Sequence, residues 1–382
     1  MMLSINSSMI KRIIILFIVQ FCLFGCRTAT DPVRGCNKEI PAGKEYPVIA
    51  LLPIHNISGT KAPLDEIRQI MEKCLHENGF PTIHEDVLNQ FIVNHRIRYI
   101  GGLDRATARN FKAETGVHTV FQTSLELYRD APMPKIVLFA RLIRIEEEGE
   151  DIVWMDSVGL SGDESPGLLD LTLVKDPQVL VQKAAEKLIR SLANNMSGSG
   201  QRSVEGSIHN HFQPKVLYGG SLLSPDKKCR VAVAPFYNSS QRKYAGDIIA
   251  LHFFNHLISY DNITVVEPGD VRNAFLQWRI IMDDGISLTN AKVLFRKLGV
   301  DYILTGNVLD YEDEQGSVGK PKVHFSAFLI EKNSMQVVWS TTSYNQGDDR
   351  VFFFGLGDVK TAHTLATQMA EQAVGTIIMP AP

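Results

Sequence analysis

Hydrophobic and polar residues follow the same order twice along the chain. Residues 47–56 read PVIALLPIHN and residues 229–238 read CRVAVAPFYN, so both are short apolar strands that run into a proline and an asparagine. AETGVHTVFQTSLELY at 113–128 is matched by RKLGVDYILTGNVLDY at 296–311. Two further apolar runs, KIVLFARLI and IVWMDS, are matched in the same order by KVHFSAFLI and VVWSTT. The pattern predicts a tandem duplication of one domain.

The spacing between matching residues is nearly constant. Pro53 and Pro235 are 182 residues apart, and Trp154 and Trp339 are 185 apart. We therefore expect the two copies to superpose, and we call them repeat 1 and repeat 2. The expected parts of the chain are a signal peptide at 1–25, a tether at 26–45, repeat 1 at 46–196, a flexible Gly/Ser-rich linker at 197–228, and repeat 2 at 229–380.

Each repeat is expected to contain a strand, a helix, a strand, two helices, three strands and a closing helix, in that order. The third helix is expected to begin after Asp104 or Ser287, because both residues are good N-caps. It is expected to end at Gly116 or Gly299, since glycine adopts the left-handed conformation of a helix end without penalty. The three strands are expected at 118–127, 135–145 and 151–158, and at 301–310, 322–331 and 336–344. The predicted fold class is α/β, with two tandem copies of a mixed-sheet sandwich domain joined by a flexible linker.

The first residues carry a targeting signal. Lys11 and Arg12 precede a short apolar run that ends in Leu23-Phe24-Gly25-Cys26. The run is too short for a comfortable permanent membrane span. Its end resembles the lipobox of bacterial lipoproteins, in which the cysteine is acylated and becomes the mature amino terminus. Several acyl chains anchor a protein stably, because burial of each CH2 is worth about 0.8 kcal/mol. Cys26 is therefore the expected lipidation site, and a plain signal anchor is the alternative.

Composition narrows the classes of function and leaves the cysteines open. The 382 residues are 45% hydrophobic and 21% charged, and their net charge of −3 gives no support to nucleic-acid binding. No second apolar stretch reaches the length of a membrane-spanning helix. Cys36, Cys74 and Cys229 follow the lipobox. In an oxidising compartment they allow one disulfide in any of three pairings, or none.

Three stretches of repeat 2 carry a family resemblance. VAVAPFYNSS, LGVDYILTGNVLDY and FSAFLIEKNSMQVVWSTT resemble the domain shared by the curli secretion lipoprotein family (CsgG), the amino-terminal domain of TolB and the lipoprotein activators of peptidoglycan synthases. Repeat 1 departs from the pattern, because TGVHTVFQTSL lacks the Asp-Tyr and the Thr-Gly. The resemblance implies a mixed-sheet α/β sandwich and a non-catalytic role in the bacterial envelope, with members that differ in task.

Candidate catalytic or metal-binding groups are few. His252 and His256 have the i, i+4 spacing of a helical zinc pair, but Phe253 stands where a metalloprotease places its glutamate. A core or partly exposed role is therefore expected for both histidines. His209 and His211 form a His-x-His in the linker and are expected to be solvated. We expect no catalytic residue, no cofactor, no metal and no enzymatic activity.

The expected function is that of a lipid-anchored envelope protein, facing the periplasm, that acts as a scaffold, assembly or activator factor. Its expected partners are the membrane, through Cys26, and other envelope proteins or a second copy of itself; Arg27 after the lipobox cysteine favours the outer membrane. A periplasmic glycan- or peptide-binding or hydrolytic module is the alternative. Two loops in equivalent positions of the repeats are unusually apolar for connecting segments and form a candidate interface. The residues of this candidate interface are Leu168, Leu171, Phe352, Phe353 and Phe354.

Overall fold

A computed structural model describes most of the chain after residue 45. The described residues are 46–146, 150–163, 173–198, 212–219, 223, 227–282, 285–313, 320–349 and 359–378. Lys44–Pro382 form one compact unit. None of the helices within the described ranges is long and apolar enough to span a membrane. The candidate interface, Cys26, Cys36, His209 and His211 lie outside these ranges, so the expectations for them stay predictions.

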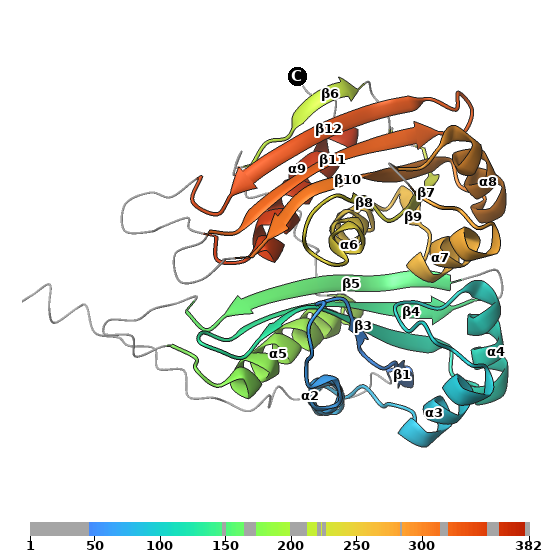
Figure 1. Cartoon of the computed structure of the whole chain (residues 1–382). Helices are drawn as coiled ribbons and strands as arrows, with labels where there is room; N and C mark the ends of the chain where they lie inside the picture. The colour runs from blue at the N-terminus through green and yellow to red at the C-terminus, as the bar shows by residue number, and fades with distance from the viewer. Residues whose placement is uncertain are drawn as a thin grey trace, which may run out of the picture. The chain divides into compact units, whose positions relative to one another are not determined.

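Repeat 1 contains the expected helices and the three long strands in the expected order, but the strand expected between its first two helices is only an isolated bridge between Ile49 and Thr82 (Figure 1). Its five-stranded sheet, sheet A, has the order β1-β3-β4-β5, with β2 also paired to β3. The pairs β1·β3 and β2·β3 are parallel, and the pairs β3·β4 and β4·β5 are antiparallel, so the sheet is mixed. The elements are β1 Ile49–Leu51, β2 His55–Asn56, α2 Leu64–Glu77, α3 Glu85–Asn94, α4 Arg105–Thr115, β3 Thr119–Arg129, β4 Lys135–Ile145, β5 Glu150–Ser161 and α5 Pro177–Met196.

Repeat 2 has the same succession of helices and long strands and the same mixed pairing in a seven-stranded sheet, sheet B, and it has the expected short strand between its first two helices. The strand order is β6-β12-β11-β10-β7-β9, and β8 also pairs with β10. The elements are β6 Lys215–Gly219, β7 Cys229–Val233, β8 Tyr237–Asn238, α6 Ala245–Leu257, β9 Ile263–Val265, α7 Pro268–Gln277, α8 Leu288–Leu298, β10 Tyr302–Glu312, β11 Lys322–Glu331, β12 Val337–Gln346 and α9 Ala362–Ile378. The predicted fold class, two α/β domains with mixed sheets, is confirmed.

Local details repeat as closely as the element order. The side chains of Asp104 and Ser287 accept hydrogen bonds from backbone amides in the first turns of α4 and α8. Both helices end at the expected glycines, which have positive φ values of 71° and 63°. The indole N–H of Trp154 lies 3.4 Å from the hydroxyl of Ser191, and that of Trp339 lies 3.1 Å from the hydroxyl of Thr376. Each tryptophan thus joins its sheet to the closing helix of its repeat.

One difference between the repeats, Thr123 in repeat 1 against Gly306 in repeat 2, has a steric reason. A side chain at Gly306 would place its Cβ 2.0 Å from the carbonyl oxygen of Ser326 and 2.6 Å from the ring of Phe236. Repeat 1 has the smaller Ile54 where repeat 2 has Phe236, and it accommodates Thr123 where repeat 2 needs Gly306. The glycine and the phenylalanine are therefore a matched pair, and repeat 1 lacks both.

Part of the range expected to be linker belongs to sheet B. β6 pairs antiparallel with β12, from Trp339 opposite Gly219 to Thr342 opposite Lys215. Phe212 and Leu223, on either side of β6, are buried in the same apolar cluster as the core of repeat 2. A single short apolar run, VLY, is too weak a signal to show a strand inside a Gly- and Ser-rich stretch.

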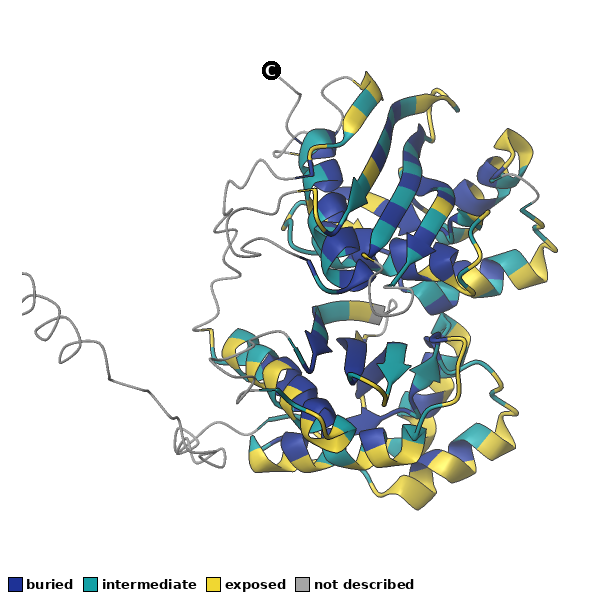
Figure 2. Ribbon diagram, turned by 60° about the vertical axis from the view of Figure 1, so that its left-hand side comes forward, coloured by how far each residue is buried: buried dark blue, intermediate teal, exposed yellow. Residues whose placement is uncertain are grey.

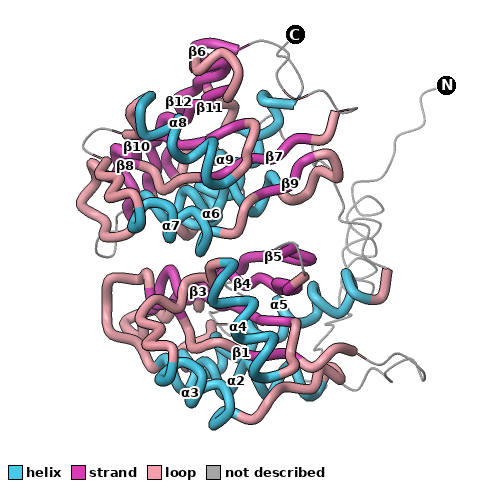
Figure 3. Tube along the Cα trace, turned by 90° about the vertical axis from the view of Figure 1, so that its right-hand side faces the viewer, coloured by secondary structure: helices cyan, strands magenta, loops and turns pink. Residues whose placement is uncertain are grey.

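The two repeats bury their sheets differently. Along β4, both faces are buried for nine consecutive residues, whereas β11 alternates between buried and partly exposed residues (Figure 2). One face of sheet A packs against α2 and α5 of its own repeat. Its other face packs partly against α3 and α4, and partly, through Phe139 and Met155, against α6 and α9 of repeat 2. We call this second contact the inter-repeat interface; α6 and α7 lie between the two sheets in Figures 1 and 3.

Candidate functional site

A buried ion pair crosses the inter-repeat interface. Arg141 on β4 donates to Glu267, which precedes α7, through Nε to Oε2 at 3.1 Å and through Nη2 to Oε1 at 2.7 Å. Nη2 also donates to the carbonyl oxygen of Gly101 at 2.7 Å. The two side chains are 2% and 0% exposed. Burial raises the pKa of Glu267, and the neighbouring guanidinium opposes that rise.

Glycines let the backbones of the two repeats approach closely at this point. A Cβ on Gly102 would lie 2.5 Å from a carboxylate oxygen of Glu267, and a Cβ on Gly269 would lie 2.3 Å from the carbonyl oxygen of Leu103. One residue further on, the carboxylate of Asp270 accepts from the backbone amide of Arg105 at 2.8 Å. The amino terminus of α4 in repeat 1 is thus capped partly by a side chain of repeat 2.

A second polar group lies at the other end of the interface, around Glu126 of β3. Its Oε1 accepts a hydrogen bond from the hydroxyl of Tyr311, and its Oε2 lies 2.7 Å from Nδ1 of His363 on α9. Arg242 donates to the carbonyl oxygens of Ser58 and Glu126 in repeat 1. Burial and the nearby carboxylate raise the pKa of Tyr311 well above its usual value. The hydroxyl is therefore a donor to Glu126 at every physiological pH.

Two histidines of repeat 2 pack beside this group. The rings of His252 and His363 lie 4.8 Å apart, and each meets the ring of Phe139 edge to face at about 5 Å. Nδ1 of His252 lies 3.0 Å from the hydroxyl of Thr367. Its Nε2 is buried and has no hydrogen-bond partner within the described structure. Burial lowers the pKa of His252 well below its usual value, and the two neighbouring histidines lower it further.

A cavity of about 430 Å³ lies between the two polar groups. It is lined by apolar side chains of both repeats and by the polar side chains of His55, Tyr99, Ser124, Tyr244, Asp247 and Arg272. The guanidinium of Arg272 lies 3.9 Å from the ring centroid of Tyr99, and the ring of His55 meets Tyr99 edge to face. Among the described residues, no carboxylate oxygen lies within 4.0 Å of the nitrogens of Arg272.

Burial controls the charges in this cavity. It lowers the pKa of His55 to about 4, with help from Arg141 and Arg272, so the imidazole is neutral at physiological pH. It raises the pKa of Tyr99 to about 12 and also raises the pKa of Asp247. Arg272 therefore carries the permanent positive charge of the cavity. His55 and Tyr99 are neutral there, and burial disfavours the negative charge of Asp247. Such a cavity favours a small ligand with an anionic group and an apolar body.

The structure separates residues that the sequence had paired and joins others. His252 is buried on α6 and His256 is partly exposed, which agrees with the core or partly exposed role expected for both, but only His252 belongs to the group with Glu126 and His363. Ser161, in the GLSGD stretch, is buried and hydrogen-bonds to Asp163. Cys74 and Cys229 are buried thiols that are not joined to each other.

Sequence reasoning missed Glu126, Arg141, Glu267 and the cavity. The contacts of these three residues, and the lining of the cavity, involve both repeats, and the sequence does not show which parts of the repeats meet. A signal was nevertheless present in the alignment of the repeats. Glu126 stands where repeat 2 has Leu309. A charged residue on an otherwise apolar strand, with an apolar residue at the same position of the other repeat, indicates a contact that only one repeat makes.

Comparisons with known proteins give partial likenesses. No protein-family model and no curated protein matches the chain. The PelC dodecamer from Paraburkholderia phytofirmans is similar over 44% of this chain and 99% of its own, with 18% identity and a TM-score of 0.32. Lipoprotein GNA1162 from Neisseria meningitidis is similar over 38% of this chain and 98% of its own, with 16% identity and a TM-score of 0.28. The LpoB carboxy-terminal domain from Salmonella enterica is similar over 31% of this chain and 84% of its own, with 16% identity and a TM-score of 0.25.

Proposed function

We propose that this protein is a lipid-anchored, periplasm-facing envelope protein that acts without catalysis, as a scaffold, assembly or activator factor that binds another envelope protein. The lipobox at Cys26 supports the anchor, and Arg27 behind it favours the outer membrane. Mass spectrometry of the mature amino terminus tests this part: we expect an acylated Cys26. An unmodified Cys26 in a protein released from membranes contradicts it.

One observation supports protein binding above all: exposed apolar side chains gather where α7 connects to α8. Leu276, Trp278, Ile281 and Leu288 are 59%, 46%, 72% and 54% exposed. Trp278 lies over the side chain of Lys297, with the ammonium 4.4 Å from the ring centroid, so α8 holds the indole in place. Exposed aromatic and aliphatic residues of this kind supply binding energy in protein interfaces. We call these four residues the α7–α8 patch.

The corresponding connection of repeat 1 provides a natural comparison. Arg96 and Arg279 occupy the same position in the two connections, and both have a positive φ, 51° and 48°. Against this shared backbone, repeat 1 has His95 where repeat 2 has Trp278, and Arg98 where repeat 2 has Ile281. The fold therefore does not require apolar residues at these positions. Their presence in repeat 2 supports a role in binding.

The test uses the full-length protein in membranes. A photo-crosslinking amino acid placed at 288 is expected to capture an envelope protein, and the variant Trp278→Ser/Ile281→Ser is expected to fold and to lose that product. His95→Ser/Arg98→Ser is the matched control and is expected to keep it. Phe352→Ser/Phe353→Ser tests the candidate interface in the same assay. Retention of the partner by a folded Trp278→Ser/Ile281→Ser variant refutes the α7–α8 patch.

The cavity between the repeats favours a second candidate function, the binding of a small anionic ligand. Its volume is within the range of small-molecule sites, and Arg272, whose guanidinium lies over the ring of Tyr99, is among its lining residues. Native mass spectrometry of the protein extracted from membranes is expected to show a bound small molecule, which Arg272→Met loses. An identical mass excess in Arg272→Met, or none in the natural protein, contradicts this function.

A further inference from the structure

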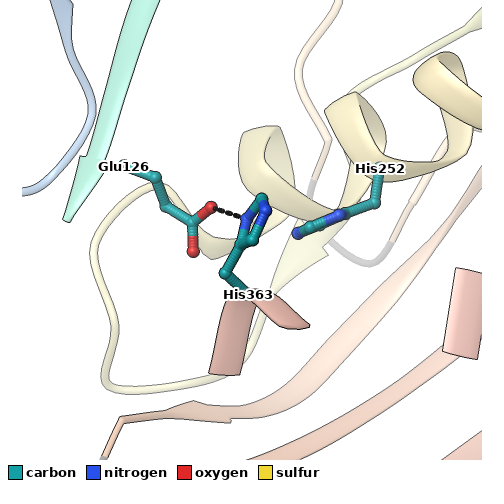
Figure 4. A group of neighbouring side chains, drawn as sticks. All are labelled: Glu126, His252 and His363. Carbon is teal, nitrogen blue, oxygen red and sulfur yellow. Dashed lines mark hydrogen bonds and ion pairs between the residues drawn. The ribbon is translucent and has the colours of Figure 1, made fainter. Parts of the chain in front are cut away.

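The residues Glu126, His252 and His363 form a compact set of potential metal ligands inside the protein. Each offers one ligand atom, and these atoms all lie within 4.8 Å of one another. The three residues are 0%, 1% and 3% exposed. Figure 4 shows the carboxylate and the two imidazole rings pointing toward one another, Glu126 from a strand of repeat 1 and the histidines from two helices of repeat 2.

The unpartnered nitrogen of His252 points to a ligand. Its Nδ1 contacts the hydroxyl of Thr367, while Nε2 is buried without a hydrogen-bond partner in the described structure. Buried polar atoms are rarely left unpaired, because an unpaired one destabilises the fold. Histidine ligands in proteins commonly bond a metal through one ring nitrogen and an oxygen through the other. His252 has that arrangement with the metal position open.

The other two residues supply the charge and the supporting contacts that a metal ligand set needs. Glu126 brings a carboxylate into a buried position, held by the hydroxyl of Tyr311 and by the imidazole of His363. The contact brings an oxygen of Glu126 and a ring nitrogen of His363 within 2.7 Å of each other.

The fold does not itself require these residues. At the 182-residue offset that relates the first helices of the repeats, His252 corresponds to Ile70. On the matching strands, Glu126 corresponds to Leu309. Apolar residues thus satisfy the same positions of the same fold in the other repeat. The polar set exists only where the two repeats meet.

We propose that Glu126, His252 and His363 bind one zinc-type divalent transition metal ion, which joins repeat 1 to repeat 2. Two imidazoles and one carboxylate are a ligand set that suits Zn²⁺, whereas Ca²⁺ and Mg²⁺ prefer oxygen ligands alone. Tetrahedral ligands about 2.0–2.1 Å from zinc are about 3.3–3.4 Å apart. Side-chain movements of about 1 Å bring the three atoms from their present spacing to that geometry.

The test titrates the full-length protein, solubilised in a nonionic detergent and stripped with a chelator, with Co²⁺. We expect one equivalent to produce the visible absorption bands of a four-coordinate site without thiolate bands, and equimolar Zn²⁺ to abolish them. His252→Gln and Glu126→Leu are expected to lose the bands, whereas His118→Gln, at an exposed histidine, is expected to keep them. Circular dichroism without metal verifies that each variant is folded.

A second measurement needs no variant. X-ray absorption of the zinc-loaded natural protein is expected to show imidazole nitrogens and oxygen at about 2.0 Å and no sulfur. Zinc is also expected to raise the melting temperature by several degrees, as binding to the native state alone requires. The proposal is overturned if the stripped protein gives no bands, if sulfur appears among the ligands, or if folded His252→Gln binds Co²⁺ as tightly as the natural protein.

Discussion

Replacing Arg141 with methionine is expected to destabilise the protein strongly, because Glu267 then keeps a buried charge without its partner. The present pair makes two hydrogen bonds of 2.7 and 3.1 Å between side chains that are 2% and 0% exposed. Breaking a pair this deeply buried costs about 3–5 kcal/mol, a large share of the roughly 5–15 kcal/mol that holds a typical protein folded. The contact with Gly101 is lost as well.

Removal of both charges is expected to cost far less than removal of one. Arg141→Met/Glu267→Met leaves no buried charge, and apolar replacements of whole ion pairs are often neutral. We expect the free energy of unfolding of the double variant to lie within about 2 kcal/mol of that of the natural protein. The double-mutant cycle of Arg141 and Glu267 then gives a coupling energy clearly different from zero. Glu267→Met alone leaves Arg141 unpaired and is expected to resemble Arg141→Met.

The pH dependence gives this reasoning an independent check. Burial already raises the pKa of Glu267, and loss of Arg141 raises it further. The folded variant then binds a proton more tightly than the unfolded chain, so it loses stability as the pH rises through the folded pKa. The deficit of Arg141→Met is therefore expected to be larger at pH 8 than at pH 5.

Urea unfolding of the full-length protein in nonionic detergent measures these differences by tryptophan fluorescence, to which Trp154 contributes from repeat 1 and Trp339 from repeat 2. Both tryptophans are buried, at 2% and 0% exposure, so unfolding changes their surroundings. A loss of less than about 1 kcal/mol in Arg141→Met, or an equal loss at both pH values, refutes the reasoning. Two separate transitions in the natural protein refute the idea that the interface couples the repeats.

Three further changes test other parts of the structure by thermal or urea unfolding. Gly306→Ala is expected to lower the free energy of unfolding by at least about 1–3 kcal/mol, because the new Cβ meets the backbone of Ser326 and the ring of Phe236. An unchanged melting temperature contradicts the proposed pairing of that glycine with the aromatic ring. Phe139→Ala is expected to cost about 3–5 kcal/mol through loss of packing at the inter-repeat interface, and a cost below about 1 kcal/mol shows that the interface is loose. The pKa of His55 is lowered to about 4, so as the pH falls the unfolded chain takes up a proton at this residue before the folded protein does. The free energy of unfolding is therefore expected to fall between pH 6.5 and about 4, by at most about 1.4 kcal/mol per pH unit. His55→Gln is expected to reduce this pH dependence, and an unchanged pH dependence argues against a buried neutral imidazole.

The fold was largely predictable from sequence because its signals are local. The caps at Asp104 and Ser287, and the glycines that end α4 and α8, act within a few residues, and the structure has all four where expected. The strand β6 was missed because it is stabilised by pairing with β12, far along the chain. Pairing partners of that kind leave no periodic pattern in a five-residue segment.

The inter-repeat site was not predicted, since it depends on which face of each sheet is covered. The matched runs KIVLFARLI and KVHFSAFLI hold the relevant difference. Val137 and Phe139 of the first run correspond to His324 and Ser326 of the second. Apolar residues on both faces of a strand indicate that both faces are buried, and polar alternation indicates an open face. The differences between the two runs, more than their likenesses, therefore indicate that repeat 1 has a covered second face.

The alternating exposure of β11 has a consequence for assembly. In this chain α6 and α9 of repeat 2 pack on sheet A of repeat 1. A head-to-tail contact of this kind can in principle be repeated by further copies. Sheet B offers the next copy the same surface, but Ser326 and Thr342 stand opposite each other there, next to His324 opposite Tyr344. Terminal members of repeat arrays carry a polar outer face of this kind, which water solvates. The face that repeat 1 buries with Val137 and Phe139 is polar in repeat 2, at His324 and Ser326, and is therefore poorly suited to receive the helices of a further copy.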